Sequence, residues 1–359
     1  MIQHRFSRNN NPEFSKILRN RVNEYFKSNK ISRNANFEMK LKTLAALSLY
    51  IIPFFVVLFA GIQNLLVLYS LWILMGIGKC FIGTSVMHDA IHGSYSSKKI
   101  INTLLSYTAN LIGADANIWR IQHNVLHHTF TNIENIDEDI EPRYFMRFSP
   151  FQPKKWFHKY QHIYAVILYC ISTLVWVTAK DFFKLFNYRN KGALKSDSEF
   201  YQFLILMIIK KALYLATFIA LPAYILPYSF GITFSMFITM HLVAGFLLTM
   251  AFQPAHLVDS SEFFVHEEPK INENWEVHQL KTTSNFATDN ALFSWYVGGL
   301  NYQIEHHLFA NICHVHYPKI AKIVESTAKE YDYPYITRTT LLGALKGHYS
   351  FLRKLGQAN

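Results

Sequence analysis

Histidines are closely spaced in the segment QHNVLHHTFTN. His123 and His127 lie four residues apart and His128 follows directly, while the earlier segment HDAIH separates His88 and His92 by the same interval. Residues four apart share one face of a helix, so their ring nitrogens can converge on one ion. Neutral imidazoles gain little from one another, and protonated imidazoles repel. The spacing therefore favours ligation of a metal ion over a role in an apolar core.

Two further positions extend this set of candidate ligands. The segment QIEHH contains Gln303, His306 and His307, and His256 ends a long apolar segment. With the two earlier segments these make eight histidines, which are too many for one ion and enough for two ions with open positions. The groups contain no cysteine, which argues against a closed thiolate zinc site. Imidazole suits zinc, copper, iron or nickel, and a binuclear site with neutral ligands suits dioxygen chemistry at iron.

The remaining histidines need no metal to explain them. We interpret His4, His158, His162 and His348 as ordinary hydrogen-bonded residues of the surface or core. His241 lies inside a long apolar segment, where an ionisable group is a hint of function. A hydrogen-bonded contact between helices is still the simpler interpretation of His241.

The apolar residues indicate a membrane protein. They make up 51% of the 359 residues and are concentrated in long runs. A membrane-spanning helix needs ~20 apolar residues. Four runs meet this requirement, and a fifth, residues 163–179, is also sufficiently apolar. The four predicted spans cover residues 44–61, 65–87, 212–228 and 232–255.

The distribution of charge predicts the topology of these runs. The N-terminal segment, residues 1–43, is basic, so the positive-inside rule places it in the cytoplasm. Basic residues flank residues 163–179 on both sides, so we expect this segment to lie in the interface without crossing. Lys210 and Lys211 should lie at the mouth of the third span and extend to the lipid headgroups. Five or six spans remain the alternative.

These observations predict one all-α integral membrane domain over residues 1–359. Four transmembrane helices would form two hairpins, with both termini on the cytoplasmic face. Residues 88–211 and 256–359 would form a cytoplasmic helical cap that carries the two-metal site.

Net charge and cysteine content restrict the partners. The net charge of +11 suits a lipid surface, a phosphate-bearing substrate or an acidic redox protein. A nucleic acid is not expected, because no helix or arm concentrates the basic residues. Cys80, Cys170 and Cys313 form no pattern typical of a disulfide framework or a CxxC motif. The first apolar run begins only near Leu44, so we expect no cleavable signal sequence.

Three segments together carry a family resemblance. HDAIHGS, QHNVLHHTFTN and NYQIEHHLF resemble, in this order, the three histidine boxes of the membrane fatty-acid desaturases. The resemblance runs from the first span to about Pro318. It implies a four-span bundle beneath a cytoplasmic cap with two irons. It also implies an oxidoreductase that uses O2 to introduce a cis double bond into a long-chain acyl substrate.

Site residues follow from the resemblance box by box. Gln303 stands where many desaturases have histidine, which is typical of the front-end branch, the delta-5/delta-6 type that includes linoleoyl-CoA desaturases. Gln303 could be a weak ligand, a ligand through water or a hydrogen-bond donor, and His278 could compensate for it or face the substrate. The resemblance assigns iron ligation to His88, His92, His123, His127, His128, His256, His306 and His307.

Polar residues near the boxes are candidates to orient the ligands, because a ligating histidine usually donates its other N–H to such a group. For Glu138 and Glu141 a solvated loop is the simpler interpretation. The candidates to orient the ligands are Asp89, Asn132, Asp137, Asp139 and Glu305.

The resemblance also implies an electron donor. No HPGG haem motif occurs, and the residues before the first span are too few for a fused cytochrome b5 domain, so a separate ferredoxin or cytochrome b5 is expected. Both donors are typically acidic, which gives the basic face a docking role. The same face would equally suit lipid headgroups or the phosphates of coenzyme A, and either acyl-CoA or an acyl-lipid could be the substrate.

Other functions are compatible with parts of the pattern. A hydroxylase, an acetylenase or a sphingolipid desaturase would use the same scaffold. A haem electron carrier or a metal transporter belongs to another class. Haem-binding histidines usually occur singly on facing spans at membrane depth, and a transport path would place polar residues along the spans. Here the histidines cluster at the ends of nearly uncharged spans.

Overall fold

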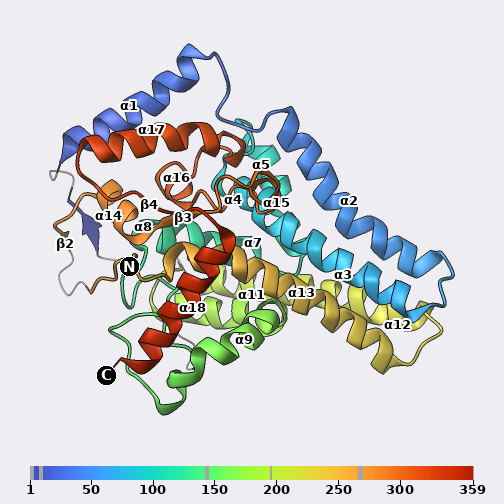
Figure 1. Cartoon of the computed structure of the whole chain (residues 1–359). Helices are drawn as coiled ribbons and strands as arrows, with labels where there is room; N and C mark the ends of the chain where they lie inside the picture. Colours follow the sequence, from blue (N-terminus) through green and yellow to red (C-terminus); the bar gives the residue numbers. More distant parts are fainter. Residues whose placement is uncertain (1–3, 8–10, 142–144, 195, 266–269, 359) are drawn as a thin grey trace.

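The computed structural model describes residues 4–7, 11–141, 145–194, 196–265 and 270–358. Within these residues the chain is mostly helical, with two short pairs of parallel strands. The predicted all-α class is therefore confirmed. Figure 1 shows long helices that extend to one side of the molecule and shorter elements gathered at the other side.

Among the described residues, five helical stretches are long and apolar enough to cross a membrane. Two of the predicted spans, residues 65–87 and 232–255, lie within such stretches, while residues 44–61 and 212–228 overlap two others and run slightly past their ends. The fifth stretch contains residues 163–179, which we expected in the interface. The stretches are Phe37–Phe59, Leu65–His92, Trp156–Asn190, Asp197–Ile225 and Phe230–His256.

Caps explain where several of these helices begin. α2 (Phe37–Phe59) begins before the predicted residue 44, because the side chain of Asn36 accepts the N–H of Met39. α11 (Asp197–Leu215) begins long before the predicted residue 212, because Ser196 caps it through the N–H of Glu199. Hydrophobic runs therefore located the helices but underestimated their length.

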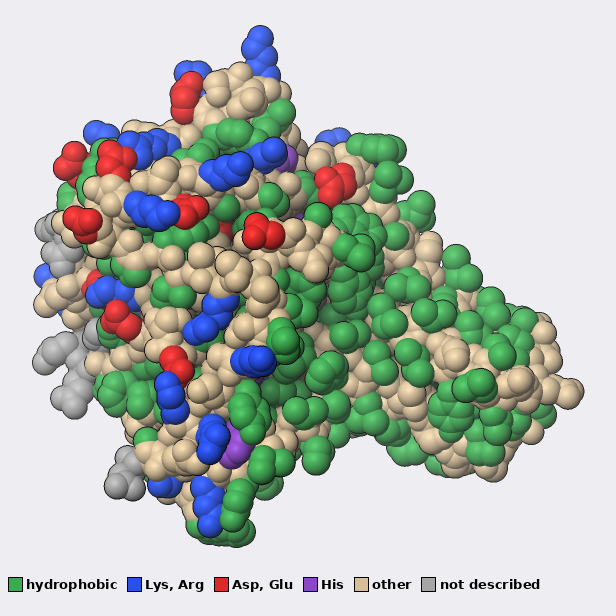
Figure 2. Space-filling view, viewed as in Figure 1, with side chains coloured by type: hydrophobic (Ala, Val, Ile, Leu, Met, Phe, Trp, Pro, Cys, Tyr) green, Lys and Arg blue, Asp and Glu red, His purple; other side chains and the backbone are tan. Residues whose placement is uncertain are grey.

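Two hairpins extend in the same direction (Figure 1). α2 and α3 (Leu65–Phe81) form the first. α11, followed by α12 (Leu221–Ile225), and α13 (Phe230–His256) form the second. Charged side chains gather on the opposite part of the surface, and the projecting end is apolar (Figure 2). This division agrees with a membrane-embedded part beneath a polar cap.

Glycines allow the long helices to approach closely. A Cβ on Gly76 of α3 would lie 2.7 Å from the carbonyl oxygen of Met240 in α13. A Cβ on Gly245 of α13 would lie 2.3 Å from the carbonyl oxygen of Cys170 in α9 (Gln161–Val175). Small residues at such crossings are typical of membrane helix packing. α9 is therefore packed along α13 instead of standing apart from the bundle.

Lys210 and Lys211 do not extend to the headgroups, so that prediction was wrong. Lys211 is buried, and its Nζ lies 2.6 Å from a carboxylate oxygen of Asp181. It also donates to the carbonyl oxygen of Gly113 at 2.7 Å, while Lys210 pairs with Asp115 at 2.9 Å. Because α11 begins at Asp197, both lysines lie well inside it and meet carboxylates from neighbouring elements.

The cap consists of short elements around the inner ends of the long helices. Helices α1 and α17 pack together through apolar side chains, including Phe14, Leu18 and Val324. The helices are α1 (Pro12–Ser28), α4 (His88–His92), α5 (Lys99–Ser106), α6 (Thr108–Leu111), α7 (Ala116–Arg120), α8 (His128–Phe130), α10 (Asp181–Asn190), α14 (Trp275–Thr282), α15 (Ala291–Tyr296), α16 (Gln303–Leu308), α17 (Tyr317–Glu330) and α18 (Leu341–Gln357).

Two strand pairs connect distant segments of the cap. β1 (Arg5–Phe6) pairs with β2 (Lys270–Ile271), and β3 (Ser284–Phe286) pairs with β4 (Ile336–Arg338), both in parallel. β3 also packs against α13 and α16. The strand thus holds the helix that carries the third histidine segment beside the end of the last long helix.

The Lys211–Asp181 pair yields a stability prediction. Replacing Lys211 with Met should leave a buried carboxylate unpaired and cost about 3–5 kcal/mol of unfolding free energy. Thermal unfolding of the detergent-solubilised protein measures this. The matched control is Lys329→Met, which breaks the exposed Lys329–Glu325 pair and should cost at most about 1 kcal/mol. Equal losses in both variants would contradict the structural role of the buried pair.

Candidate metal centre

The first histidine segment lies at the inner end of the α3 stretch. A π-helical turn, Ile82–Met87, continues α3 into α4, which carries His88 and His92. Their rings are 4.8 Å apart, as the four-residue spacing predicted. Gly93 ends the helix with a left-handed φ of 76°, a conformation that costs glycine little.

The second segment differs from the predicted α-helix. Asp115 caps α7 by accepting the N–H groups of Asn117 and Ile118, and the chain then continues as a π-helix over Ile121–His127. His123 and His127 lie in this wider turn with their rings stacked at 5.4 Å. π-Helical turns are rare and frequently occur at functional sites. Two of them adjoin histidine segments in this chain.

The third segment is held by a buried carboxylate. Glu305 of α16 accepts hydrogen bonds from Asn285 Nδ2 at 2.8 Å and from the Tyr335 hydroxyl at 3.0 Å. Burial raises the pKa of Glu305 to about 7, although both hydrogen bonds act to lower it. Asn285 also accepts the N–H of Ile304. Glu305 therefore anchors α16. We had expected it to orient the candidate ligands, but its hydrogen bonds go to Asn285 and Tyr335 instead.

All eight histidines of the predicted ligand set converge. Each member of a group offers one ligand atom within 4.8 Å of the others. His128 forms a group with His306 and His307, and so links two other groups, each of which contains one of these two residues. One of these consists of His88, His92, His123 and His306, and the other of His127, His256 and His307.

The ring nitrogens face one another in a way that fits a bound cation. The Nε2 atoms of His88 and His128 each lie 3.2 Å from Nε2 of His123. The Nε2 atoms of His92, His256 and His307 are buried and have no hydrogen-bond partner among the described residues. Buried polar atoms are rarely left unsatisfied. Metal ions placed among these lone pairs would satisfy them, so the residues present fit a metal centre.

Burial also keeps most of these rings neutral. It lowers the pKa of His123 to about 3 and holds the pKa values of His128, His306 and His307 well below the usual range. Histidine must be neutral to bind a metal. The low pKa values therefore leave the lone pairs available at neutral pH.

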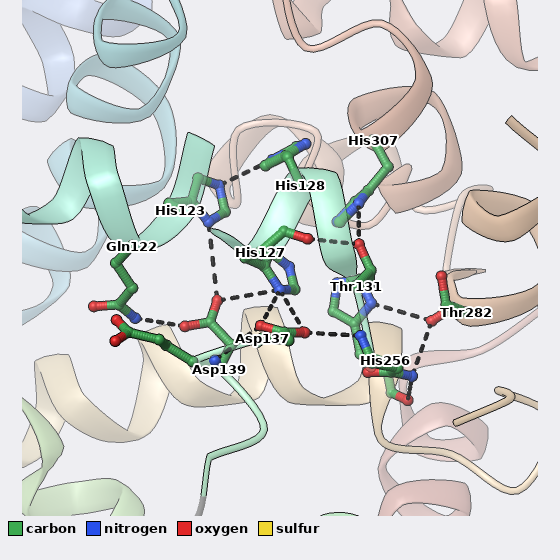
Figure 3. Close-up of polar contacts among 12 residues, drawn as sticks. Gln122, His123, His127, His128, Thr131, Asp137, Asp139, His256, Thr282 and His307 are labelled. Carbon is green, nitrogen blue, oxygen red and sulfur yellow. Dashed lines mark hydrogen bonds and ion pairs between the residues drawn. The ribbon is translucent and has the colours of Figure 1, made fainter. Parts of the chain in front are cut away.

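His127 is the exception, because two carboxylates face it (Figure 3). Burial acts to lower the pKa of His127, but Asp137 and Asp139 outweigh it and raise the pKa to about 9. Nδ1 of His127 lies 3.1 Å from both oxygens of Asp137 and 3.5 Å from Asp139. Such a carboxylate fixes the ring orientation and increases the basicity of the other nitrogen.

Other histidines are oriented by residues that sequence reasoning did not find. Nδ1 of His307 lies 2.8 Å from the amide oxygen of Gln279, and Nδ1 of His256 lies 3.2 Å from the carbonyl oxygen of Thr282. Nδ1 of His306 lies 3.3 Å from the Tyr317 hydroxyl. In each case an oxygen holds Nδ1 and leaves Nε2 directed to the cluster. No spacing signal marks these partners.

Behind His88 lies the predicted candidate Asp89, together with two residues that sequence reasoning missed, His314 and Lys42. Nδ1 of His88 is 3.8 Å from Asp89, which lies 2.9 Å from Nδ1 of His314. Nζ of Lys42 lies 2.8 Å from Nε2 of His314. Asp89, Cys313 and His314 could hold an ion by geometry alone, but Lys42 already supplies a cation there. The HVH triplet that follows the third segment was the available sequence signal.

The other candidates have distinct positions. Asn132 adopts a left-handed φ of 56°, and its side chain donates to the carbonyl oxygens of His256 and Glu262 at 3.3 and 3.1 Å. It therefore fastens the second segment to the end of α13. Gln303 is buried and adjoins His256. His278 bonds the carbonyl oxygen of Thr131 at 2.8 Å and lies outside the histidine groups.

The prediction of a solvated loop was wrong for Glu138. Its carboxylate is buried and lies 2.6 Å from Lys184 Nζ and 2.7 Å from the Tyr188 hydroxyl. Glu141 is exposed, as expected. The burial of Glu138 could not be predicted from the sequence, because its ion-pair partner, Lys184, lies in a separate helix, α10.

Comparison with known proteins decides the family. The fatty acid desaturase family model matches residues 63–339. The chain belongs to the fatty acid desaturase family. It is therefore an oxidoreductase, and the three histidine segments are the family's histidine boxes.

Named relatives extend over most of this desaturase. The acyl-lipid (8-3)-desaturase of Physcomitrium patens is 36% identical over 96% of this chain and 72% of its own length. The sn-1 linoleoyl-lipid 6-desaturase of Arthrospira platensis is 35% identical over 95% of this chain and 92% of its own length. A delta(5) fatty acid desaturase of Dictyostelium discoideum is 29% identical over 96% of this chain and 75% of its own length.

The histidines that we kept outside the metal set lie in ordinary contacts. His348 is buried between the Tyr169 hydroxyl at 2.8 Å and the carbonyl oxygen of Leu257 at 2.9 Å. His241 contacts the hydroxyl groups of Thr173 and Tyr214 at 3.0 and 3.1 Å. The interpretation of both as hydrogen-bonded core residues is confirmed.

His348 gives the desaturase a specific pH dependence. Burial lowers its pKa to about 4, so stability from the neutral ring is complete above about pH 6.5 and is lost as pH falls toward 4. At pH 5 the loss should be about 2 kcal/mol. Thermal unfolding at pH 7 and 5 measures it, and His348→Gln should shrink the difference. An unchanged pH dependence in the variant would contradict this account.

Proposed function

We propose that this desaturase is an oxygen-dependent front-end enzyme that acts on a long-chain acyl group carried by a membrane lipid. It introduces a cis double bond between an existing double bond and the carboxyl end. Support for the substrate comes from the names of the relatives, which include linoleoyl-lipid 6-, acyl-lipid (8-3)- and delta(5)-desaturases. The observation that carries the proposal is the convergence of eight histidines in a chain of this family.

The proposed metal centre contains two irons. When bound, the irons supply the oxidising chemistry that removes hydrogen from an unactivated methylene with O2. The proposed ligands of one iron are His88, His92, His123 and His306, those of the other are His127, His256 and His307, and His128 lies between them. Gln303 lies beside His256. We propose that it acts on the second iron as a weak ligand or through water, or that it donates a hydrogen bond to a ligand.

The surrounding side chains position the ligands and limit water. Trp119 stacks on His123 with ring centroids 4.2 Å apart, and Phe252 lies 6.3 Å from the rings of His88 and His123. Apolar walls strengthen electrostatic interactions inside a site and exclude side reactions. Because a methylene C–H is not acidic, the protein contributes chiefly by holding one carbon pair beside the metals.

The membrane arrangement is part of the proposal. α2, the α3 stretch, the α11–α12 stretch and α13 would cross the bilayer, with α9 in the interface and the metal centre on the cytoplasmic face. The two projecting hairpins and the concentration of charge at their inner ends support this. Electrons would come from a separate acidic protein, ferredoxin or cytochrome b5, and the net charge of +11 supports docking of such a donor.

Single ligand replacements test the metal assignment. His127→Ala and His307→Ala should each lower the iron content of the purified protein and reduce the rate of desaturation by at least about 100-fold. Loss of a residue that only orients a ligand commonly lowers metal affinity or activity by about 10- to 100-fold, and loss of the ligand itself should have a larger effect. The measurements are iron per protein and product per time. His162→Ala is the control, since His162 is partly exposed and packs against Tyr349. Full iron content in both ligand variants would refute the assignment.

Product analysis tests the reaction. A host that makes linoleoyl lipids and expresses this protein should accumulate a fatty acid with one further double bond on the carboxyl side of the existing bonds. Mass spectrometry that locates double bonds measures this. A hydroxylated product without a new double bond would indicate a hydroxylase. A strong Soret band without non-haem iron would indicate a haem carrier.

A further inference from the structure

An open pocket of about 540 Å³ lies beside the proposed metal centre. Its walls come from the end of α4, the loop before α5, α5 itself and the end of α7. His92 forms part of the wall, and among the eight proposed ligands it is the one that is not fully buried. The pocket therefore leads from the surface to the edge of the metal centre.

The pocket walls are held in place by hydrogen bonds. Asn102 accepts the N–H of Ser96 at 2.9 Å and donates to the carbonyl oxygens of Gly93 and Ser96 at 3.1 and 2.7 Å. Asn34 donates to the carbonyl oxygen of Ser94 at 2.9 Å. A preformed site loses less entropy when it binds a ligand. These contacts fix the loop that connects the first histidine box to α5.

The charges of the pocket select an anion. Lys99 and Arg120 line it, and Lys98 precedes Lys99 at the start of α5. None of the three forms an ion pair within the described part of the chain, and the lining contains no acidic side chain. Lysine and arginine are the usual donors to phosphate oxygens. A phosphate-bearing group fits this chemistry.

The position of α5 places the pocket at the membrane surface. Ile100 and Leu104 of α5 and Tyr107, which caps its C-terminal end, lie on one side of the helix and are 62%, 62% and 51% exposed. Asn102, on the opposite face, and Thr103, at the edge of the apolar face, line the pocket. A short helix with an exposed apolar face and basic residues at its end lies in the plane of the interface. α5 also lies close to the beginning of α2 (Figure 1).

We propose that this pocket binds the phosphate headgroup of an anionic glycerolipid whose acyl chain is the substrate. This inference rests on the proposed function and adds the headgroup chemistry of the lipid that carries the acyl chain. A front-end enzyme oxidises carbons near the carboxyl end, so the ester bond and headgroup must lie only a few carbons from the metal centre. A pocket that contains the ligand His92 in its wall provides this short separation. A soluble acyl carrier would not need the exposed apolar face of α5.

The test uses the full-length protein in nanodiscs of phosphatidylcholine. The acyl substrate is linoleoyl phosphatidylglycerol in one series and linoleoyl monogalactosyldiacylglycerol, which carries no charge, in the other. Lys99→Gln combined with Arg120→Gln should raise the half-saturating fraction of the phosphatidylglycerol roughly 30-fold, because each cation near a lipid phosphate contributes about fivefold. The maximal rate and the kinetics with the galactolipid should not change.

The matched control removes one lysine and one arginine elsewhere. Lys346→Gln with Arg353→Gln alters two exposed residues of α18 and should leave both series unchanged. Equal losses with both lipids, or no loss with either, would overturn the proposal. A lower maximal rate with every lipid, restored by chemical reduction, would show that the pocket binds the electron donor and would also overturn it.

Direct binding separates this proposal from the proposed function. Native mass spectrometry of the purified protein should show phosphatidylglycerol retained by the wild type and at least about tenfold less retained by the Lys99/Arg120 variant. If wild type makes no product but binds the lipid in this way, the proposed reaction fails and the headgroup site stands. If the retained lipid is the same in both proteins, the headgroup site fails.

Discussion

The structure depends on the electrostatics of unprotonated imidazoles in a water-poor interior. Nε2 of His128 lies 2.8 Å from Nε2 of His306 and 3.2 Å from that of His123. Lone pairs at such distances repel unless a proton or a cation lies between them. Burial opposes the proton, since it lowers the pKa of all three rings. A cation bound among these nitrogens would resolve the conflict, which is why the cluster fits the metal centre that we propose for this desaturase.

The metal centre is assembled from segments far apart in the chain, so other interactions must hold those segments together. Asn132 connects the second box to the end of α13, and Thr131 donates to Gln279, which also holds His307. Glu305 holds α16 beside β3. These residues lie outside the ligand set but fix the distances within it. Loss of such an outer residue commonly lowers metal affinity 10- to 100-fold.

Sequence located the converging histidines better than it located their surroundings. The four-residue spacing in the sequence was enough to place the ring of His88 beside that of His92 and the ring of His123 beside that of His127, and such a local rule needs no knowledge of the fold. Lys211 and Glu138 were misjudged because their partners, Asp181 and Lys184, lie in other elements. Neither the π-helical turn over Ile121–His127 nor the early start of α11 follows from hydropathy. Long-range pairing is the information that one sequence lacks.

A polar layer inside the bundle relates four long helices to the histidine cluster. Lys79 of α3 lies 3.0 Å from the Tyr214 hydroxyl and 3.2 Å from Nδ1 of His241, which also contacts Thr173. These residues come from α3, α11, α13 and α9, so the cluster fixes how four helices are rotated about their axes. Polar contacts inside membranes stabilise helix packing only modestly, but they are specific. Because α3 leads to His88 and α13 ends at His256, the rotation of these two helices affects where the two groups of candidate ligands lie relative to each other.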